Sequence, residues 1–128
     1  MATTNYQSTF IAVAADCPVS VAQPPPSKEP PSAAQIAFAM LDGHPYEYTS
    51  DDVLYAANGA RRGLSREAFL SQPQPCFRAS PLTKRYGWGV HADAAGWIAI
   101  YAVESAEYQR LATDTSLRQL SGLKTKKA

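Results

Sequence analysis

Most of the side chains with unusual chemistry lie between residues 74 and 103 of the sequence. Arg78, Lys84 and Arg85 place three positive charges in this stretch, and Ser80 adds a hydroxyl group. Guanidinium and ammonium groups that lie together can hold a phosphate or a carboxylate through charge-assisted hydrogen bonds. The alternative is a solvated connection whose cations form weak surface ion pairs. We favour an anion site, because the cations flank aromatic residues instead of following the face of a helix.

Cys76 and His91 indicate a second kind of chemistry. A thiolate could attack a substrate while an imidazole acts as the base, oriented by Tyr101 or Glu104. A cysteine more often packs as a small apolar side chain, and a histidine on a strand is more often simply hydrogen-bonded. Catalysis by Cys76 or His91 is therefore an alternative hypothesis, and neither residue is assigned a catalytic role.

Metal and cofactor chemistry receive no support from the sequence. The two histidines and two cysteines stand at spacings that fit no zinc motif. Residues 87–92 (Gly-Trp-Gly-Val-His-Ala) match the letters of a dinucleotide-binding pattern, but that motif requires a strand that turns directly into a helix. A hairpin turn follows here instead. We therefore predict no metal and no cofactor.

A β-hairpin must position these residues. Residues 86–91 and 97–103 are rich in aromatic and β-branched side chains, and the Asp-Ala-Ala-Gly sequence at 93–96 fits a tight turn closed by glycine. A three-residue loop determines which residues of the two strands lie opposite each other. The predicted pairs are Asp93 with Trp97, His91 with Ala99, Val90 with Ile100, and Gly89 with Tyr101.

Side chains alternate between the two faces of this hairpin. The predicted core face carries Trp88, Val90, Ile98, Ile100 and Ala102, and the opposite face carries Gly87, Gly89, His91, Ala99, Tyr101 and Val103. Glycine inside a strand often marks the close approach of a ligand, so we expect a shallow trough at this second face. The predicted ligand-binding residues are Arg78, Ser80, Lys84, Arg85, Gly87, Gly89, His91 and Tyr101.

The remaining segments predict an α+β fold, in which a small antiparallel sheet packs against several short helices. Strands are expected at about residues 9–14, 75–79, 86–91 and 97–103. Capping signals and apolar spacing predict helices at 33–42, 65–70, 106–111 and 115–123, and one more from Thr49 to a stop at Gly59 or Gly63. Prolines forbid regular structure in the connection at 18–31. Residues 1–123 should form one domain, followed by a basic, frayed tail at 124–128.

Length, charge and composition limit the class of protein. A chain of 128 residues with 45% hydrophobic residues can bury a core. The net charge is +1, but Lys124, Lys126 and Lys127 lie at the C-terminus, and the remaining nine cations face eleven anions. This slightly acidic body argues against binding to nucleic acid. Two cysteines, no secretion signal and no membrane-length apolar segment predict a cytoplasmic protein that does not associate with membranes.

Three blocks of the sequence are distinctive: residues 78–91 (R-A-S-P-L-T-K-R-Y-G-W-G-V-H), 45–54 (P-Y-E-Y-T-S-D-D-V-L) and 101–105 (Y-A-V-E-S). Together they resemble a family of small uncharacterised proteins that is catalogued only as a domain of unknown function. The resemblance covers nearly the whole chain. It implies no particular activity, ligand or cofactor.

We therefore expect a small cytoplasmic binding or interaction domain that recognises an anionic small molecule through the face formed by residues 78–91. One alternative is an enzyme that uses Cys76 or His91 in the same cleft. Another is a structural domain that only contacts other proteins. The sequence determines neither the ligand nor the oligomeric state.

Overall fold

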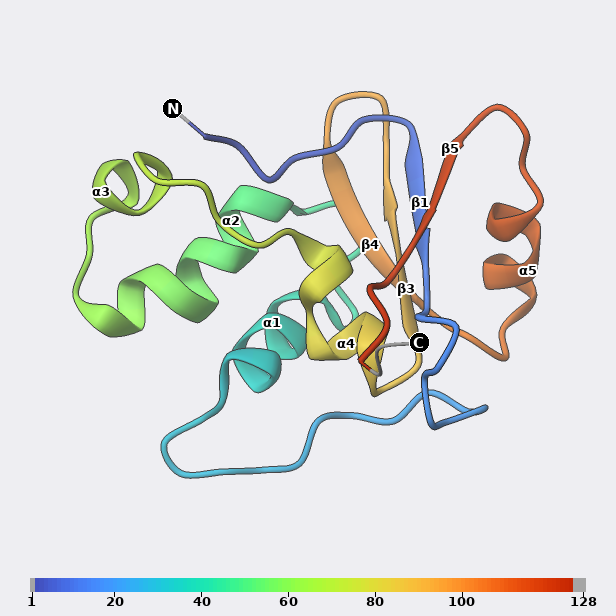
Figure 1. Cartoon of the computed structure of the whole chain (residues 1–128), viewed down its shortest axis with the longest axis horizontal. Coiled ribbons are helices and arrows are strands. Elements are labelled where there is room, and N and C mark those ends of the chain that lie inside the picture. Colours follow the sequence, from blue (N-terminus) through green and yellow to red (C-terminus); the bar gives the residue numbers. More distant parts are fainter. Residues whose placement is uncertain (1, 126–128) are drawn as a thin grey trace.

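A five-stranded mixed sheet divides the helices into two groups in the computed structural model, which describes residues 2–125 (Figure 1). The strand order is β2-β4-β3-β1-β5, and the strands are β1 (Thr9–Ala12), β2 (Tyr48–Thr49), β3 (Trp88–Ala92), β4 (Trp97–Ala102) and β5 (Arg118–Ser121). β1 and β5 are parallel, whereas the other neighbouring strands are antiparallel. The predicted α+β class is confirmed, but the sheet is mixed rather than antiparallel throughout.

Short helices lie on both sides of the sheet. One side, at the left of Figure 1, carries α1 (Ala33–Leu41), α2 (Ser50–Leu54), the π-helix η1 (Tyr55–Gly59), the 3-10 helix η2 (Ala60–Arg62), α3 (Arg66–Leu70), the 3-10 helix η3 (Phe77–Ala79) and α4 (Pro81–Lys84). The other side carries α5 (Ala106–Ala112). Predicted caps begin several of them, because the hydroxyl groups of Ser32, Thr49, Ser65 and Ser105 accept hydrogen bonds from backbone N–H groups of the first turn.

The hairpin of β3 and β4 has the predicted register, with His91 opposite Ala99 and Gly89 opposite Tyr101. A carboxylate oxygen of Asp93 closes the turn by accepting hydrogen bonds from two backbone N–H groups, one of them that of Trp97. The turn ends at a glycine with φ of +94°, a conformation that residues with a side chain rarely adopt. The sequence of the turn therefore determines the pairing of these two strands.

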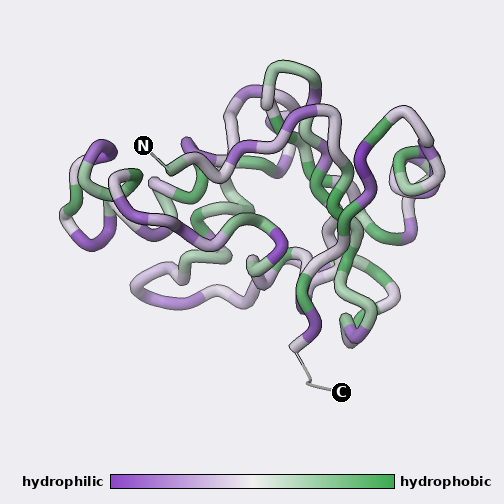
Figure 2. The backbone as a smooth tube through the Cα atoms, turned by 45° about the horizontal axis from the view of Figure 1, so that its top comes forward, coloured by the Kyte–Doolittle hydropathy of each residue, from purple (hydrophilic) through white to green (hydrophobic). Residues whose placement is uncertain are grey.

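The larger core lies between the sheet and the helices on the left of Figure 1. Its buried residues are Ile11, Ala37, Leu41, Val53, Leu54, Ala57, Phe77, Leu82, Val90, Ala92 and Ile98. A smaller core of Phe10, Tyr108 and Leu111 lies between the sheet and α5. Figure 2 shows hydrophobic stretches along the central strands, while many hydrophilic stretches lie in outer connections. The sheet is thus covered by apolar side chains on both faces.

Two predicted elements differ from the structure. Residues 75–79 were expected to form a strand, but they lead into η3, and α4 follows directly. Ser80 and Pro81 explain this, because the serine hydroxyl caps α4 and proline is well suited to the first position of a helix. Residues 115–123 were expected to be helical, but they contain β5, which gains hydrogen bonds by pairing with β1.

The proline-rich connection contains no helix or strand over residues 13–32. Backbone and side-chain hydrogen bonds hold it to the start of the hairpin, since Gln23 N–H donates to the Tyr86 carbonyl and Trp88 Nε1 donates to the Gln23 carbonyl at 2.8 Å. At the C-terminus, the backbone N–H of Thr125 donates to a carboxylate oxygen of Asp16. The rest of the predicted tail, residues 126–128, lies outside the described residues.

Candidate functional site

The trough that the hairpin glycines predicted is closed. A Cβ atom at Gly89 would lie 2.6 Å from a ring carbon of Tyr108 and 2.7 Å from a ring carbon of Phe10. Gly89 is therefore a glycine because α5 and β1 pack directly on it, and not because a ligand approaches. At Gly87 the proline-rich connection takes the same role, since a Cβ atom there would lie 3.1 Å from the Cα of Ala22.

The predicted cations serve the fold in different ways. Arg78 is half-buried, and its Nε donates a hydrogen bond of 2.7 Å to the carbonyl of Ser121 in β5. Ser80 caps α4 through its hydroxyl group. Lys84 is half-buried and Arg85 is exposed, and the described residues provide neither of them with an ion pair. Anion binding by this group stays a prediction.

Cys76 and His91 do not meet. The Sγ of Cys76 lies 3.3 Å from the hydroxyl of Tyr6, on the side of the sheet that faces the larger core. His91 lies on the opposite side, where it contacts Tyr46. Because the sheet separates them, the two residues cannot act as nucleophile and base on one substrate. Catalysis by Cys76 or His91 alone stays an alternative hypothesis.

A pocket of about 600 Å³ lies among the helices on the side of the larger core. Its walls come from α1, from the α2–η1–η2 segment, from α3 and from the chain that leads into α4. The lining residues are Ala33, Ala34, Ala37, Leu54, Ala57, Asn58, Arg61, Arg62, Phe69, Gln74, Pro75, Cys76, Ala79, Ser80 and Pro81. The pocket therefore combines a mostly apolar wall with a few polar groups, as ligand sites commonly do.

The π-helix η1 forms one wall of this pocket. The N–H of Ala60 donates to the carbonyl of Tyr55, five residues earlier, and this wider turn carries Ala57 and Asn58 into the lining. Gly59 leaves no space for a side chain, because a Cβ atom there would lie 2.8 Å from the ring of Phe69. Single π-turns occur frequently at functional sites. The sequence carried no signal for this wall beyond the glycine.

Two arginines supply the charge of the pocket. Arg62 is held in place, because its Nε donates a hydrogen bond of 2.8 Å to the Asn58 carbonyl and its guanidinium lies 5.9 Å from the centre of the Phe69 ring. Both arginines are exposed, and the described residues give the guanidinium of Arg61 no hydrogen bond or ion pair. No carboxylate of the described residues lines the pocket. The local charge is therefore positive.

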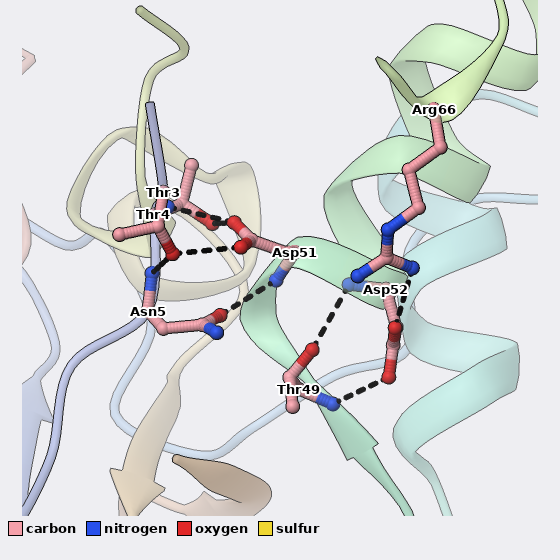
Figure 3. A network of polar contacts seen from close by, with 7 residues as sticks. All are labelled: Thr3, Thr4, Asn5, Thr49, Asp51, Asp52 and Arg66. Atoms are coloured by element: carbon pink, nitrogen blue, oxygen red, sulfur yellow. Dashed lines mark hydrogen bonds and ion pairs between the residues drawn. The ribbon is translucent and has the colours of Figure 1, made fainter. Parts of the chain in front are cut away.

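A buried carboxylate fixes the helix that precedes this wall (Figure 3). Asp51 is 6% exposed and accepts hydrogen bonds from the hydroxyl of Thr3 and from both the N–H and the hydroxyl of Thr4. The Asn5 side chain accepts from the N–H of Asp51. On the other side of the same turn, Arg66 in α3 forms an ion pair of 2.6 Å with Asp52. The N-terminal segment and α3 are thus both fastened to α2.

A second polar cluster lies on the face of the sheet that α5 covers. The hydroxyl of Tyr46 lies 2.7 Å from Nδ1 of His91 and 2.9 Å from the hydroxyl of Tyr101. The hairpin predicted that His91 and Tyr101 share a face, but Tyr46, which joins them, was missed. Its φ of +58° is unusual for a residue with a side chain, and no sequence pattern around Pro45 predicts it.

Burial determines the charge of this second cluster. It lowers the pKa of His91 below its ordinary value of 6.5, although Asp93 and Asp114 raise it. Burial and the hydrogen bond to Tyr101 raise the pKa of Tyr46 well above its ordinary value of 10.0. Tyr46 is therefore a neutral phenol, and His91 is largely neutral at neutral pH.

Two classes of site receive no support from the described residues. Among residues 2–125, no group of three or more His, Cys, Asp or Glu side chains is placed to hold a metal ion. No helix in this part of the chain has the length and apolar composition that crossing a membrane requires.

Fold and pocket define a small α+β domain with a positively charged, mostly apolar pocket. The chain belongs to a family of unknown function, DUF6157, which matches it over residues 1–128. No curated protein and no solved structure matches it.

Proposed function

We propose that this protein is a small-molecule binding domain for an organic anion with an apolar body, and that the ligand occupies the pocket beneath Arg61 and Arg62. The observation that carries this proposal is the composition of the pocket lining. Alanine, leucine, proline and phenylalanine side chains form the wall, two arginines lie in it, and no described carboxylate does. Such a site should bind a ligand that has both an apolar part, which is buried against the wall, and a negative charge, which forms hydrogen bonds with an arginine.

The size of the pocket supports the same class of ligand. A volume of about 600 Å³ is within the range of pockets that hold drug-sized molecules. Five alanines in the lining leave room that larger side chains would fill. A medium-chain or aromatic carboxylate would place its carbon skeleton against these alanines and its carboxylate near Arg61. Gln74 and Ser80 provide neutral hydrogen-bonding groups in the same wall.

The two arginines have different parts in this proposal. Arg62 already bonds to the Asn58 carbonyl and lies over Phe69, so its position costs little entropy on binding. Arg61 is exposed and free to turn toward an incoming carboxylate. We expect Arg61 to supply the charge-assisted hydrogen bond, while Arg62 shapes the mouth of the pocket. Both cysteines are free thiols, which favours a reducing compartment such as the cytoplasm as the place of function.

Octanoate is a suitable probe, and octanol of equal chain length is its neutral control. We expect octanoate to shift the backbone amide signals of residues 33–37, 57–62 and 74–81 in a labelled sample, and octanol to bind more weakly. Arg61→Ala should weaken octanoate binding by about 1.5 to 3 kcal/mol, the value of a hydrogen bond to a charged group. Arg85→Ala removes an exposed arginine outside the pocket and should leave binding unchanged.

Three results would contradict the proposal. Octanol and octanoate could bind equally well, Arg61→Ala could bind like the wild type, or the shifts could fall on residues 78–91 outside the pocket lining. The last result would instead favour the cationic stretch that the sequence indicated.

A further inference from the structure

The cluster of Tyr46, His91 and Tyr101 has a hydrogen-bonding property that the proposed pocket does not use. Tyr46 has one hydroxyl proton and two close partners, the Nδ1 of His91 and the hydroxyl of Tyr101. It can donate to only one of them, and when its proton lies within the cluster it accepts from the other. Burial lowers the pKa of His91 and so favours its neutral form, in which the second ring nitrogen, Nε2, has the opposite role to Nδ1.

Two arrangements follow from this count. If Tyr46 donates to Nδ1, then Nε2 of His91 carries a proton and donates, and the oxygen of Tyr101 is left to accept. If Nδ1 carries the proton, then Nε2 accepts and the hydroxyl of Tyr101 is free to donate. In both arrangements the cluster offers one donor and one acceptor. A ligand with two neighbouring hydroxyl groups suits this combination, because each hydroxyl can either donate or accept a hydrogen bond.

The open end of the cluster reaches solvent. No described residue forms a hydrogen bond with Nε2 of His91, yet this atom is not among the buried side-chain atoms that lack a partner. Nε2 is therefore not completely buried. His91, Tyr46 and Tyr101 are all half-buried, so their polar ends can be contacted while their rings stay fixed.

The ring of Tyr46 provides an aromatic surface beside the polar end of the cluster. Its backbone N–H donates to the Ile98 carbonyl in β4, whereas its hydroxyl reaches His91 in β3, so its ring crosses β4 near Ala99. Ala99 is 1% exposed, which agrees with a ring lying over it. Trp97 is two residues from Ala99 on the same face of β4, and it is 41% exposed.

The charge near the cluster does not suit an anion. Asp93 and Asp114 act on His91 as negative charges, and Arg110 is the cation that acts on it. Two carboxylates against one guanidinium leave a negative balance, which would repel a second anion. A neutral hydroxylated ligand avoids this repulsion. Trp97 is a diagonal neighbour of His91 across the strand pair, and such positions are about 7 to 8 Å apart in antiparallel sheets, so its side chain can cover one ring of such a ligand while the cluster holds the next.

We propose that Tyr46, His91, Tyr101 and Trp97 form a second binding site, which takes a short neutral oligosaccharide. One sugar ring stacks on Trp97. Hydroxyl groups of the neighbouring ring bond to Nε2 of His91 and to the hydroxyl of Tyr101. Tyr46 is a positioning residue, because it couples the two hydrogen-bonding groups and contributes its ring to the surface.

The site is tested with maltotriose, cellotriose and triacetylchitotriose as neutral probes, and with octanoate as the anionic comparison. At least one trisaccharide should shift the amide signals of residues 46, 91, 97 and 101 and quench the fluorescence of Trp97, recorded in a Trp88→Phe background. Trp97→Ala should weaken binding of that sugar at least tenfold. Tyr46→Phe should weaken it about tenfold, since the coupling of His91 and Tyr101 is lost.

Tyr55→Phe is the matched control, because it removes a hydroxyl group that bonds to the Leu64 carbonyl in another part of the molecule. This variant should bind the sugar as the wild type does. If no trisaccharide perturbs these residues, or if Trp97→Ala and Tyr46→Phe bind unchanged while folded, the second site does not exist. If octanoate shifts residues 46, 91, 97 and 101 more than any sugar does, the ligand class is wrong. Neither result affects the pocket of Arg61 and Arg62, which lies on the other side of the sheet.

Discussion

Gly89 shows how little an isolated residue type says about its surroundings. A glycine in a strand indicates that something approaches closely, and this much was predictable from the sequence. The sequence could not indicate that the approaching groups are Phe10 and Tyr108 of the same chain, because they are distant along it. The same limit applies to Tyr46, whose partner His91 is 45 residues away.

Replacement of Gly89 by valine should destabilise the protein. The new side chain would overlap the rings of Phe10 and Tyr108, and overpacking of this kind costs about 1 to 3 kcal/mol. Chemical denaturation measures the loss. Gly43→Ala is a useful comparison, because no atom lies within 4 Å of its Cβ position and only the positive φ opposes the substitution. A Gly89→Val protein as stable as the wild type would show that the space beside β3 is open.

Asp51 should contribute to stability through its hydrogen bonds. Asp51→Asn removes the charge that the N–H and hydroxyl of Thr4 contact, so we expect a loss of about 1.5 to 3 kcal/mol in the free energy of unfolding. Asp42→Asn changes an exposed carboxylate and should alter stability by less than about 0.5 kcal/mol. Equal effects of the two substitutions in denaturant titrations would contradict the role of Asp51.

The stability that depends on His91 should decrease in acid. Burial lowers the pKa of His91 in the folded protein below its unfolded value near 6.5, so the unfolded chain binds more protons between these two values. The contribution of His91 to the stability of the fold is therefore complete above about pH 6.5, and it is lost as the pH falls through the pKa of His91 in the folded protein. Denaturation of wild type and His91→Gln at several pH values measures it. The difference between the two proteins should be larger at neutral pH than in acid, and a constant difference would argue against the shift.

At the level of elements, local signals predicted the structure wherever a few neighbouring residues determine it. Ser32 and Thr49 begin helices, and the Asp93 turn sets the register of the hairpin. The prediction failed for β5. Leucines spaced by three residues suit a helix, so the local pattern alone predicted the wrong element. Parallel pairing with β1, more than a hundred residues earlier, decides this segment. The pocket was also missed, because its walls come from separate helices.

A pair of proline substitutions can test the pairing of β5. The N–H groups of Arg118 and Gly122 donate to the carbonyls of Ser8, just before β1, and Ala12 in β1, and alternation along the strand points the N–H of Leu120 in the same direction and that of Ser121 away. Leu120→Pro should therefore lower the melting temperature markedly, by removing a hydrogen bond inside the sheet. Ser121→Pro keeps the carbonyl that Arg78 contacts and should be tolerated better. The opposite order of melting temperatures would show that the register is wrong.

For the whole molecule, the two ends of the chain are fastened very differently. The N-terminal segment bonds to Leu70 and Asp51, and these contacts hold α3 and α2. Beyond Leu123, the described contact of the C-terminus is one exposed hydrogen bond from Thr125 to Asp16. The ends should therefore differ in their importance for stability.

Deletion of residues 1–5 should lower the melting temperature by many degrees, because it leaves the buried Asp51 carboxylate without its donors. Deletion of residues 124–128 should lower it by only about 4 °C or less, which corresponds to roughly 1 kcal/mol for a chain of this size. Differential scanning calorimetry of both truncated proteins provides the comparison. A larger loss from the C-terminal deletion would contradict this assignment.

The place of β1 in the sheet has a consequence for synthesis on the ribosome. β1 is made early, yet its two neighbours, β3 and β5, begin only at residues 88 and 118. Until those segments emerge, Phe10 and Ile11, which end with 0% and 3% exposure, have no strands to cover them. Until residue 88 is made, the nascent chain thus carries an apolar segment without either of its partner strands, a form in which aggregation competes with folding. The sheet is complete only once β5, which ends at Ser121, has been made.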